Sequence, residues 1–395
     1  MADAAAATPM RDFGVYIHVP FCSVRCGYCD FNTYAPGEVD GATPASYVEA
    51  ALREMELARR EMRGDERAAA TVFFGGGTPT MLDAPALARL LSGVRQTWGL
   101  APDAEVTTEA NPDSVTPESL ATLAQAGFTR VSFGMQSAVP HVLATLDRTH
   151  NPENVALAVG WAKEAGLATS LDLIYGTPGE SLEDWRRSLD AAVALEPDHV
   201  SAYALVIEPG TRMGAQLRRG EIAPTDPDLQ ADMYELADTV LADAGYSWYE
   251  VSNWSRSREH RCRHNIGYWL SQDWWGIGPG AHSYLGPRTG PDGEPCGARR
   301  WWNVKHPRAY AERLARGESP EQDGEELSES DLALESIMLR VRLADGMPVP
   351  PGSAEAVARL IADGLVDERK AHAGVLVLTR RGRLLADRVV RELAD

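Results

Sequence analysis

Three cysteines crowded into one short loop are the residues of this chain whose type and spacing best suit chemistry. Cys22, Cys26 and Cys29 lie in the segment YIHVPFCSVRCGYCDF with the spacing C-x3-C-x2-C. Thiolates are soft ligands that suit iron–sulfur clusters, and such short gaps keep the three sulfurs close to one another. We therefore predict a [4Fe-4S] cluster that is held by three thiolates and leaves its fourth iron without a protein ligand.

An iron without a protein ligand can bind the amino and carboxylate groups of S-adenosylmethionine (SAM). One electron from the cluster can then cleave a carbon–sulfur bond of the sulfonium, so the loop predicts SAM as a cofactor. Two other interpretations stay open. A structural zinc site would need a fourth ligand, such as His18 or Cys262. A redox pair of Cys26 and Cys29 would leave Cys22 unexplained.

A run of three glycines follows the next predicted strand, at Gly75, Gly76 and Gly77 in FFGGGTPT. Residues without side chains let a ligand approach the backbone closely, although a tight turn would also explain them. Because the glycines come directly after the second strand and face the cysteine loop, we expect them to bind the amino group of SAM.

Four polar residues lie at the ends of later predicted strands or soon after them. They are Glu109 in TTEANP, Gln136 in FGMQS, Arg148 and Asp172. A carboxylate can accept from both ribose hydroxyls, an arginine can pair with the SAM carboxylate, and a glutamine can do either. A surface or helix-cap role would explain any one of them, but as a set they predict contact with a ligand.

These residues require a sheet whose strands all end at one edge. From residue 12 to about residue 204, short β-branched or aromatic runs alternate with amphipathic helical stretches, which is typical of a parallel sheet with crossover helices. We predict a partial (β/α) barrel or an open α/β sheet, with the site at the carboxyl ends of the strands. The predicted strands are VYIHVP, TVFFGGG, EVTTEA, RVSFGMQ, ATSLDLIYG and HVSAYAL, and the helices between them lie near 46–62, 84–98, 117–126, 152–165 and 182–195.

We divide the chain into four parts. A frayed, disordered N-terminus over residues 1–12 precedes a core domain over 13–245, and a Trp-rich segment over 246–320 extends that core. Residues 321–395 are predicted to form a smaller, mainly helical, winged-helix-like domain. The acidic stretch GESPEQDGEELSES marks the boundary as a solvated connector.

Charge and composition exclude several classes of protein. The 395 residues carry a formal net charge of −19, which repels a phosphate backbone, so we expect no nucleic-acid partner. No run approaches the roughly 18 apolar residues of a membrane-spanning helix, and the first residues lack the features of a signal peptide. We expect a cytoplasmic protein whose thiols stay reduced.

Taken together, the motifs resemble those of a known family. The cysteine loop, GGGTPT, TTEANP, SFGMQS and DLIYGTPGES occur in this order. Over nearly its whole length the chain resembles the radical SAM family of oxygen-independent coproporphyrinogen dehydrogenase and its relatives. The resemblance implies an α/β fold built on a partial (β/α)6 TIM-like barrel. By the same resemblance, the residues that contact SAM are Tyr16, Tyr28, Gly76, Gly77, Thr78, Glu109, Gln136, Arg148, Asp172 and, as a weaker match, Ala204.

Two features separate the chain from the dehydrogenase itself. The dehydrogenase has a further cysteine two positions after the third ligand, where this chain has Phe31. It also has a longer N-terminal segment that helps to hold its substrate, whereas only 21 residues precede Cys22 here. Both features match the heme-chaperone branch of the family, which implies heme as a ligand.

That branch also carries an HNxxYW motif, which is present here in RCRHNIGYW. Imidazole can ligate heme iron while aromatic faces cover the macrocycle. The residues alone favour an aromatic core with a hydrogen-bonded histidine, and the resemblance favours a heme site instead. His282 and Cys262 are alternative iron ligands, although Cys262 and Cys296 are otherwise predicted to be simple thiols. The motif residues are His264, Asn265, Tyr268 and Trp269.

Three functions follow from these patterns. The first, which we expect, is a heme chaperone without dehydrogenase activity. It would use the cluster and SAM to control its oligomeric state or heme release, form a homodimer when the cluster is loaded, and pass heme to an acceptor such as a membrane-associated respiratory enzyme. The second is a dehydrogenase that decarboxylates the propionates of coproporphyrinogen III. The third is a radical SAM enzyme of another tetrapyrrole or specialised pathway.

Overall fold

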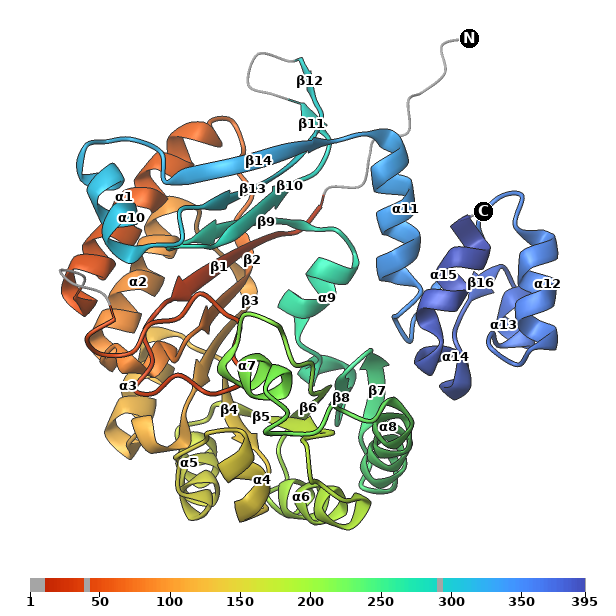
Figure 1. Cartoon of the computed structure of the whole chain (residues 1–395). Coiled ribbons are helices and arrows are strands. Elements are labelled where there is room, and N and C mark those ends of the chain that lie inside the picture. The colour runs from red at the N-terminus through yellow and green to blue at the C-terminus, as the bar shows by residue number, and fades with distance from the viewer. Residues whose placement is uncertain (1–10, 39–42, 290–293, 395) are drawn as a thin grey trace, which may run out of the picture.

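Twelve strands form one continuous sheet, in which six neighbouring strands run parallel in the order of the chain (Figure 1). These six are the strands that the sequence predicts, so the expected partial barrel is confirmed. The structure is a computed structural model that describes residues 11–38, 43–289 and 294–394, and most of the predicted disordered N-terminus (1–12) lies outside the described residues. In sheet order the strands are β14 (Glu321–Leu327), β13 (Ala298–Asn303), β10 (His282–Leu285), β9 (Asp273–Ile277), β1 (Phe13–Val19), β2 (Ala69–Gly76), β3 (Leu100–Ala110), β4 (Arg130–Gln136), β5 (Ala168–Tyr175), β6 (His199–Ala204), β8 (Asn253–Ser255) and β7 (Ser247–Glu250).

The helices between residues 44 and 194 connect the six parallel strands and cover the outer face of the barrel (Figure 1). Several of them begin at a hydroxyl side chain that accepts from a backbone N–H of the first turn, as Thr43, Thr116 and Ser181 do in three capping boxes. The helices are α1 (Pro44–Glu61), α2 (Ala84–Thr97), α3 (Pro117–Ala126), α4 (Pro140–Thr145), α5 (Pro152–Glu164), α6 (Leu182–Ala194), α7 (Arg212–Arg218), α8 (Pro227–Asp243), α9 (Arg263–Trp269), α10 (Pro307–Ala315), α11 (Glu329–Arg340), α12 (Ala354–Ala362), α13 (Glu368–His372), α14 (Arg380–Leu384) and α15 (Ala386–Ala394).

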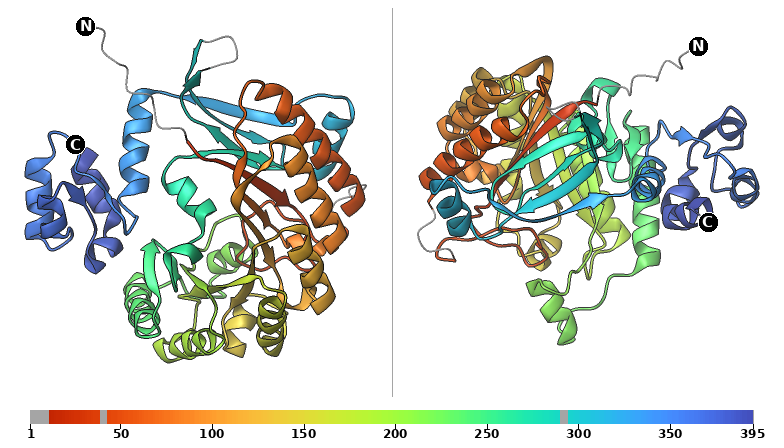
Figure 2. Two further views of the ribbon diagram at one scale, coloured as in Figure 1. Left: turned by 180° about the vertical axis from the view of Figure 1, so that it is seen from behind. Right: turned by 90° about the horizontal axis from the view of Figure 1, so that it is seen from above.

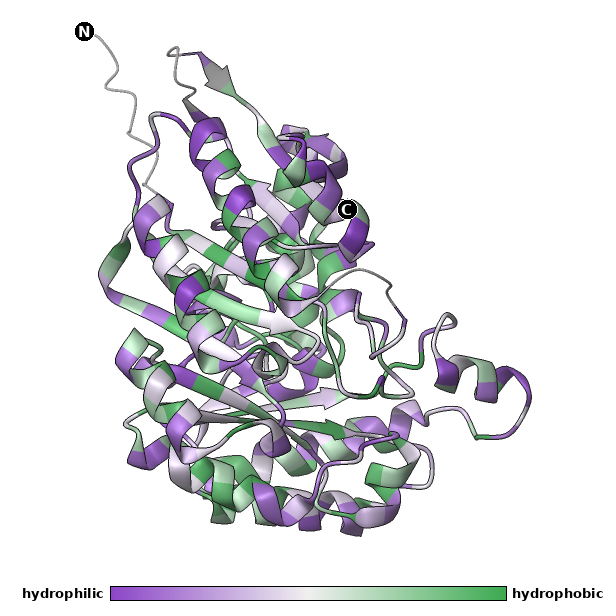
Figure 3. Cartoon of the chain, turned by 90° about the vertical axis from the view of Figure 1, so that its left-hand side faces the viewer, coloured by the Kyte–Doolittle hydropathy of each residue, from purple (hydrophilic) through white to green (hydrophobic). Residues whose placement is uncertain are grey.

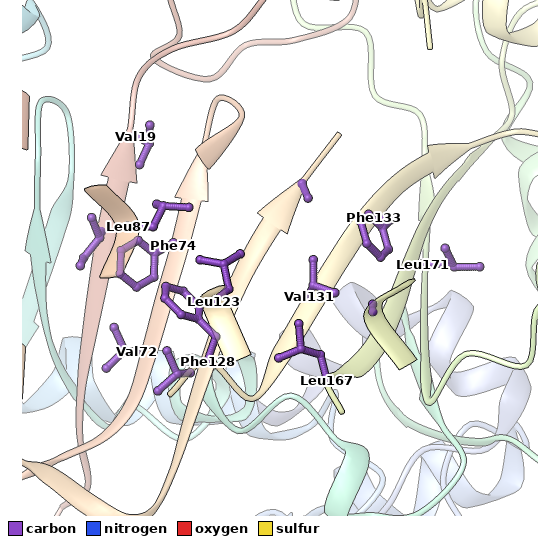
Figure 4. Packing of buried hydrophobic residues seen from close by; sticks show 14 of the residues in the cluster. Val19, Val72, Phe74, Leu87, Leu123, Phe128, Val131, Phe133, Leu167 and Leu171 are labelled. Atoms are coloured by element: carbon purple, nitrogen blue, oxygen red, sulfur yellow. The ribbon is translucent and has the colours of Figure 1, made fainter. Parts of the chain in front are cut away.

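A layer of buried apolar side chains lies between the parallel strands and these helices (Figure 4). Val72 and Phe74 of β2, Leu87 of α2, and Val131 and Phe133 of β4 belong to one cluster. Figure 3 shows hydrophobic and hydrophilic residues side by side on the outer helices, as expected of helices that bury one face. Because successive strand residues point to opposite faces, the residues between these apolar ones point into the barrel.

Strands from the second half of the chain extend both edges of the parallel sheet. The predicted acidic connector is wrong, because residues 321–327 form β14, which pairs antiparallel with β13. Arginines of β13 neutralise the acidic side chains: Arg299 pairs with Glu321 at 2.6 Å and Arg300 pairs with Glu325 at 2.7 Å. We therefore place the start of the C-terminal unit after β14 and not at its first residue.

The C-terminal residues form a second, smaller apolar cluster of their own. Helices α12 to α15 surround it together with the short strands β15 (Met347–Pro348) and β16 (Val375–Leu376), in agreement with the expected helical unit (Figure 2). Asp238 of α8 joins this unit to the core. It accepts from Arg380 at 2.7 Å and from Arg383 at 3.0 Å, and the Arg383 guanidinium lies 3.7 Å from the ring centre of Trp248.

Candidate functional site

The inner faces of strands β3 to β6 carry polar side chains that line a cavity of about 510 Å³. Ser132 of β4 lines this cavity, whereas its sequence neighbours Val131 and Phe133 belong to the apolar core. Asp172 of β5 alternates in the same way with apolar neighbours. Parallel strands that are buried on both faces are normally apolar throughout. The polar inner faces therefore mark a ligand cavity.

The cysteine loop forms one wall of this cavity. Cys22, Cys26 and Cys29 are free thiols of intermediate exposure, and all three line the cavity. Two backbone hydrogen bonds fix the loop: Cys22 N–H donates to the Tyr34 carbonyl at 3.0 Å, and Tyr34 N–H donates to the Pro20 carbonyl at 2.8 Å. The three thiols thus face one space, which is the arrangement that a cluster with an open iron requires.

The groups around the sulfurs fit a negatively charged cluster. The Thr78 hydroxyl donates to Cys22 Sγ at 3.8 Å, and Arg148 Nη1 donates to Cys26 Sγ at 3.6 Å. Burial raises the pKa of the Cys22 thiol to about 11 and also raises the pKa of Cys29. Thiols in this state must release protons when they bind iron.

The glycine run lies directly against the cysteine loop. Gly77 N–H donates to the Val19 carbonyl at 2.8 Å, and Thr78 N–H donates to the Phe21 carbonyl at 2.7 Å. A Cβ atom on Gly77 would lie 2.5 Å from the Phe21 carbonyl oxygen and 3.0 Å from the sulfur of Cys22. Close approach of two backbone segments therefore requires glycine at this position.

Two carboxyl groups face the cavity from neighbouring parts of the sheet. Burial raises the pKa of Glu109 to about 8, and the charge of Asp172 adds to this shift. Burial also raises the pKa of Asp172, although hydrogen bonds from Ser132 and Ser201 oppose the shift. Carboxyl groups with raised pKa values in a cavity are typical of binding sites. A ligand that offers hydroxyl donors and a positive charge, as SAM does, would favour their ionised forms.

Tyr28, Gln136, Arg148 and Ala204 also line the cavity. Gln136 has a φ of 63°, and such left-handed backbone at a residue with a side chain often marks a functional site. Arg148 Nη2 donates to the Gly134 carbonyl at 2.8 Å, while its buried Nε has no hydrogen-bond partner among the described residues. That N–H is suited to an anionic group such as the SAM carboxylate.

Tyr16 lies behind the lining of the cavity. Its ring stacks beside Phe73 with centroids 6.4 Å apart, and its hydroxyl is 3.1 Å from His18 Nδ1. His18 Nε2 is in turn 2.9 Å from the Asn32 carbonyl oxygen. Cys262 lines the same cavity, but its thiol donates to Glu105 Oε1 at 3.7 Å. Both candidate fourth ligands of a zinc site are therefore engaged elsewhere.

The HNxxYW motif occupies α9, which packs against the amino ends of β2 and β3. His264 is 3% exposed, and both of its ring nitrogens are hydrogen-bonded. Nδ1 is 2.8 Å from the Thr71 hydroxyl, and Nε2 is 2.8 Å from the Tyr268 hydroxyl. Burial lowers the pKa of His264 to about 3. In this conformation His264 is a neutral core residue whose two nitrogens are both engaged.

The other motif residues have different surroundings. Asn265 lines the large cavity, and the side chain of Trp269 hydrogen-bonds to Glu250. Tyr268 and His264 border a second cavity of about 110 Å³, which is small beside the roughly 300–1,000 Å³ of typical ligand pockets. In this conformation the four motif residues do not share one cavity, and heme binding by them stays a prediction.

Four residues at the floor of the large cavity were not predicted from the sequence. Thr107, Arg130, Ser170 and His199 line it from four neighbouring strands. Each is followed two residues later by another polar residue that lines the cavity, namely Glu109, Ser132, Asp172 and Ser201. This period-two pattern of polar residues is the signal that could have identified them.

Comparison with known proteins places the chain in a family. Residues 16–192 match the model of the Radical SAM superfamily. The heme chaperone HemW of Mycobacterium tuberculosis is 52% identical over 392 residues, which cover 98% of this chain and 96% of the relative. The heme chaperone HemW of Escherichia coli is 38% identical over 336 residues, which cover 85% of this chain and 83% of the relative. The chain belongs to the HemW family of radical SAM proteins.

A solved structure supports the fold. Coproporphyrinogen III oxidase (HemN) from Escherichia coli, a radical SAM enzyme, matches with a TM-score of 0.80 over 98% of this chain and 91% of that chain. Its sequence is only 22% identical, so the match shows the fold alone. Membership of the radical SAM superfamily implies a [4Fe-4S] cluster and SAM as cofactors, and the cysteine loop and cavity fit both. Within the described residues, every helix is too short or too polar to cross a bilayer.

Proposed function

We propose that the protein is a heme chaperone that binds heme, transfers it to an acceptor protein and carries a SAM-binding [4Fe-4S] cluster. The observation that carries this proposal is the 52% identity to a heme chaperone HemW over 98% of the chain. An alignment of this extent includes both the cysteine loop and the HNxxYW motif.

Phe31 supports this choice over coproporphyrinogen oxidation. The dehydrogenase that the chain resembles has a cysteine at this position, and Phe31 here is 60% exposed at the rim of the large cavity. The alternative function, oxygen-independent coproporphyrinogen III dehydrogenase, is favoured by one observation. The cavity keeps the whole set of polar residues predicted to hold SAM, apart from Tyr16 behind its wall.

We propose that heme binds at α9 and that this helix must move for His264 to bind iron. Both hydrogen bonds of its ring, to Thr71 and to Tyr268, occupy the nitrogens that iron would need. His282 is an alternative ligand, because it is exposed and stacks on Trp302 with ring centroids 5.6 Å apart. The acceptor would be a heme-requiring protein, such as a membrane-associated respiratory enzyme reached from the cytoplasm, and the cluster-loaded chaperone would be a homodimer.

The test is a heme titration followed by Soret absorbance on anaerobically reconstituted protein. The wild type should bind heme stoichiometrically, and His264→Ala should lose that binding. His282→Ala tests the alternative ligand, and His372→Ala, on the exposed face of α13, is the control. Far-UV circular dichroism of each variant checks its fold.

Turnover of coproporphyrinogen III with SAM and a reductant is measured on the same preparations. Stoichiometric heme binding without protoporphyrinogen formation supports the chaperone. Protoporphyrinogen formation without stable heme binding would overturn it and assign the protein to the dehydrogenases. If only His282→Ala loses heme binding, the protein is still a heme chaperone, and His282 is the iron ligand in place of His264.

A further inference from the structure

The mouth of the large cavity carries the two most exposed large apolar side chains of the described residues. Val206 is 64% exposed and Phe31 is 60% exposed, and both line the cavity. Val24, at 47%, and Tyr203, at 41%, line it as well. Single exposed apolar residues are common, but a group of them around one opening is typical of a surface that another molecule covers. We call these four side chains the mouth patch.

The mouth patch comes from two segments that lie side by side. Val24 and Phe31 belong to the cysteine loop, and the other two residues lie at the end of β6 and just after it. Met213 N–H of α7 donates to the Gly27 carbonyl at 2.8 Å, which attaches the chain after β6 to the loop (Figure 1). Beneath the surface, Tyr28 of the loop packs against the apolar cluster that contains Met213. The patch is therefore one continuous surface.

Charge favours the mouth patch as a place where two copies of this chain can meet. The formal net charge of −19 makes two copies repel each other in most orientations. Salt screens charges beyond roughly 8 Å, so the charges nearest a contact matter most. Five charged residues lie on the two segments or pair with them, and they are Arg25, Asp30, Asp147, Glu208 and Arg212. These two positive and three negative groups nearly balance, so the patch combines apolar side chains with weak repulsion.

The cysteines that are predicted to hold the cluster also position half of the mouth patch. Val24 lies between Cys22 and Cys26, and Phe31 is two residues after Cys29. Residues 22–29, all of which the structure describes, contain no helix or strand. Three bonds to one cluster would therefore fix the course of this loop. The position of Val24 and Phe31 then depends on whether the cluster is present.

We propose that the mouth patch is the surface through which two cluster-loaded copies of this chain form a twofold homodimer. The inference rests on the proposed function, in which the cluster-loaded chaperone is a homodimer, and it identifies the interface. In a twofold dimer each copy presents the same patch, so both signs of charge on one copy can face the opposite sign on the other. Association buries the apolar side chains, and loss of the cluster loosens the loop and separates the copies. Each copy also covers the cavity mouth of the other.

The experiment measures the monomer–dimer equilibrium of the full chain by anaerobic sedimentation velocity, with the cluster reconstituted and after its removal. The wild type should dimerise with the cluster and be monomeric without it. Val206→Ser, which lies outside the cysteine loop, should raise the Kd of the dimer about tenfold or more, because the lost side chain is buried twice in a twofold interface. Phe31→Ser should raise it further, since the apolar side chain is larger. Iron content is measured on every variant, and Val206→Ser decides alone if Phe31→Ser loses iron.

Leu157→Ser is the matched control. Leu157 is 50% exposed on α5, which covers the outer face of the barrel, so this variant should dimerise like the wild type. A second measurement follows the dissociation of SAM at rising protein concentration. SAM should dissociate more slowly from the wild type as the dimer forms, and Val206→Ser should not show this slowing at the same concentrations.

Heme titration of the same preparations separates this proposal from the proposed function. Three outcomes would overturn the interface: a wild type that stays monomeric with its cluster, an equal dimer Kd in Val206→Ser and wild type, or an equal loss of dimerisation in Leu157→Ser. Patch variants that lose heme binding but still dimerise would make the mouth patch a heme surface, which overturns the interface and keeps the chaperone function. Failure of the wild type to bind heme would contradict the proposed function, whatever its oligomeric state.

Discussion

The imidazole of His264 stacks on the ring of Phe73, with centroids 5.3 Å apart and planes inclined by 22°. Phe73 lines the large cavity from β2, and Tyr16 stacks beside both rings. The HNxxYW helix therefore touches the wall of the cavity in which SAM is predicted to bind. Any movement that releases His264 towards iron must also disturb this wall.

We expect SAM and heme to weaken each other's binding for this reason. A coupling between two binding equilibria is reciprocal, so the factor by which SAM raises the Kd of heme must equal the factor by which heme raises the Kd of SAM. Typical couplings of this kind are roughly 5- to 150-fold. Paired titrations, each ligand with and without the other, measure both factors. Independent binding would show that heme does not engage α9.

Thr71→Val should increase heme affinity. The substitution removes the hydrogen bond between Thr71 and His264 Nδ1 and leaves the ring less firmly held in the core. A typical buried hydrogen bond contributes about 1 kcal/mol, so the free energy of unfolding should fall by about that amount and heme affinity should rise several-fold. Soret titration and urea denaturation measure the two effects. Unchanged heme affinity despite the lower stability would argue against His264 as the ligand.

Glu109 should make both stability and SAM binding depend on pH. Its pKa is raised from the usual 4.5 to about 8, so between these values the unfolded chain releases a proton that the folded protein keeps. Stability attributable to this group is therefore full below pH 4.5 and declines as the pH rises towards 8. SAM affinity should rise over the same window, because the ionised carboxylate accepts from the ribose and attracts the sulfonium.

Glu109→Gln should flatten both pH profiles, raise the stability of the SAM-free protein at the alkaline end and weaken SAM binding. Urea denaturation and calorimetric SAM titration across the window give the two profiles. Glu235→Gln, on the exposed side of α8, should leave them unchanged. A Glu109→Gln variant that keeps the wild-type slopes would assign the pH dependence to another group.

Cys22→Ala should lose the cluster but keep the fold. The thiol is only partly buried, and its contact with the Thr78 hydroxyl at 3.8 Å is weak, whereas the barrel has a large apolar core that excludes the loop cysteines. The midpoint of thermal unfolding should lie within a few degrees of that of cluster-free wild type. Differential scanning calorimetry under anaerobic conditions tests this, and loss of a cooperative transition would mean that the loop is part of the folding core.

Asp238→Ala should loosen the C-terminal unit. This buried carboxylate accepts from Arg380, Arg383 and the Trp254 indole, so its removal leaves several donors unpaired. We expect a loss of about 3 kcal/mol, the magnitude of breaking a buried ion pair. Limited proteolysis should then release the C-terminal unit faster. Asp243→Ala, at the exposed end of the same helix, is the control.

The sequence predicts the parallel strands and their helices well, because apolar periodicity and hydroxyl or proline starts are local signals. The sequence does not predict β14, because its acidic residues are typical of a solvated connector. Only the fold places the arginines of β13 beside them. Arg130 is missed for a related reason. It is a single charged residue at the start of an apolar strand. The residues beside it in the fold, Thr107 and Glu105, lie on the neighbouring strand, so the local sequence does not indicate them.

The two outermost strands of the sheet also affect how copies of this chain can associate with one another. Exposed strand edges invite pairing between molecules, and acidic side chains discourage it. Two arginines of β13 pair with carboxylates of β14, but β14 carries four of them (Glu321, Asp323, Glu325 and Glu326), so its edge stays acidic and two copies that met there would repel each other. At the other end, the Tyr249 carbonyl of β7 already accepts from the Ala344 N–H at 2.9 Å. Both ends of the sheet thus discourage strand pairing between copies, which favours helices or loops as the contact surface of the proposed homodimer.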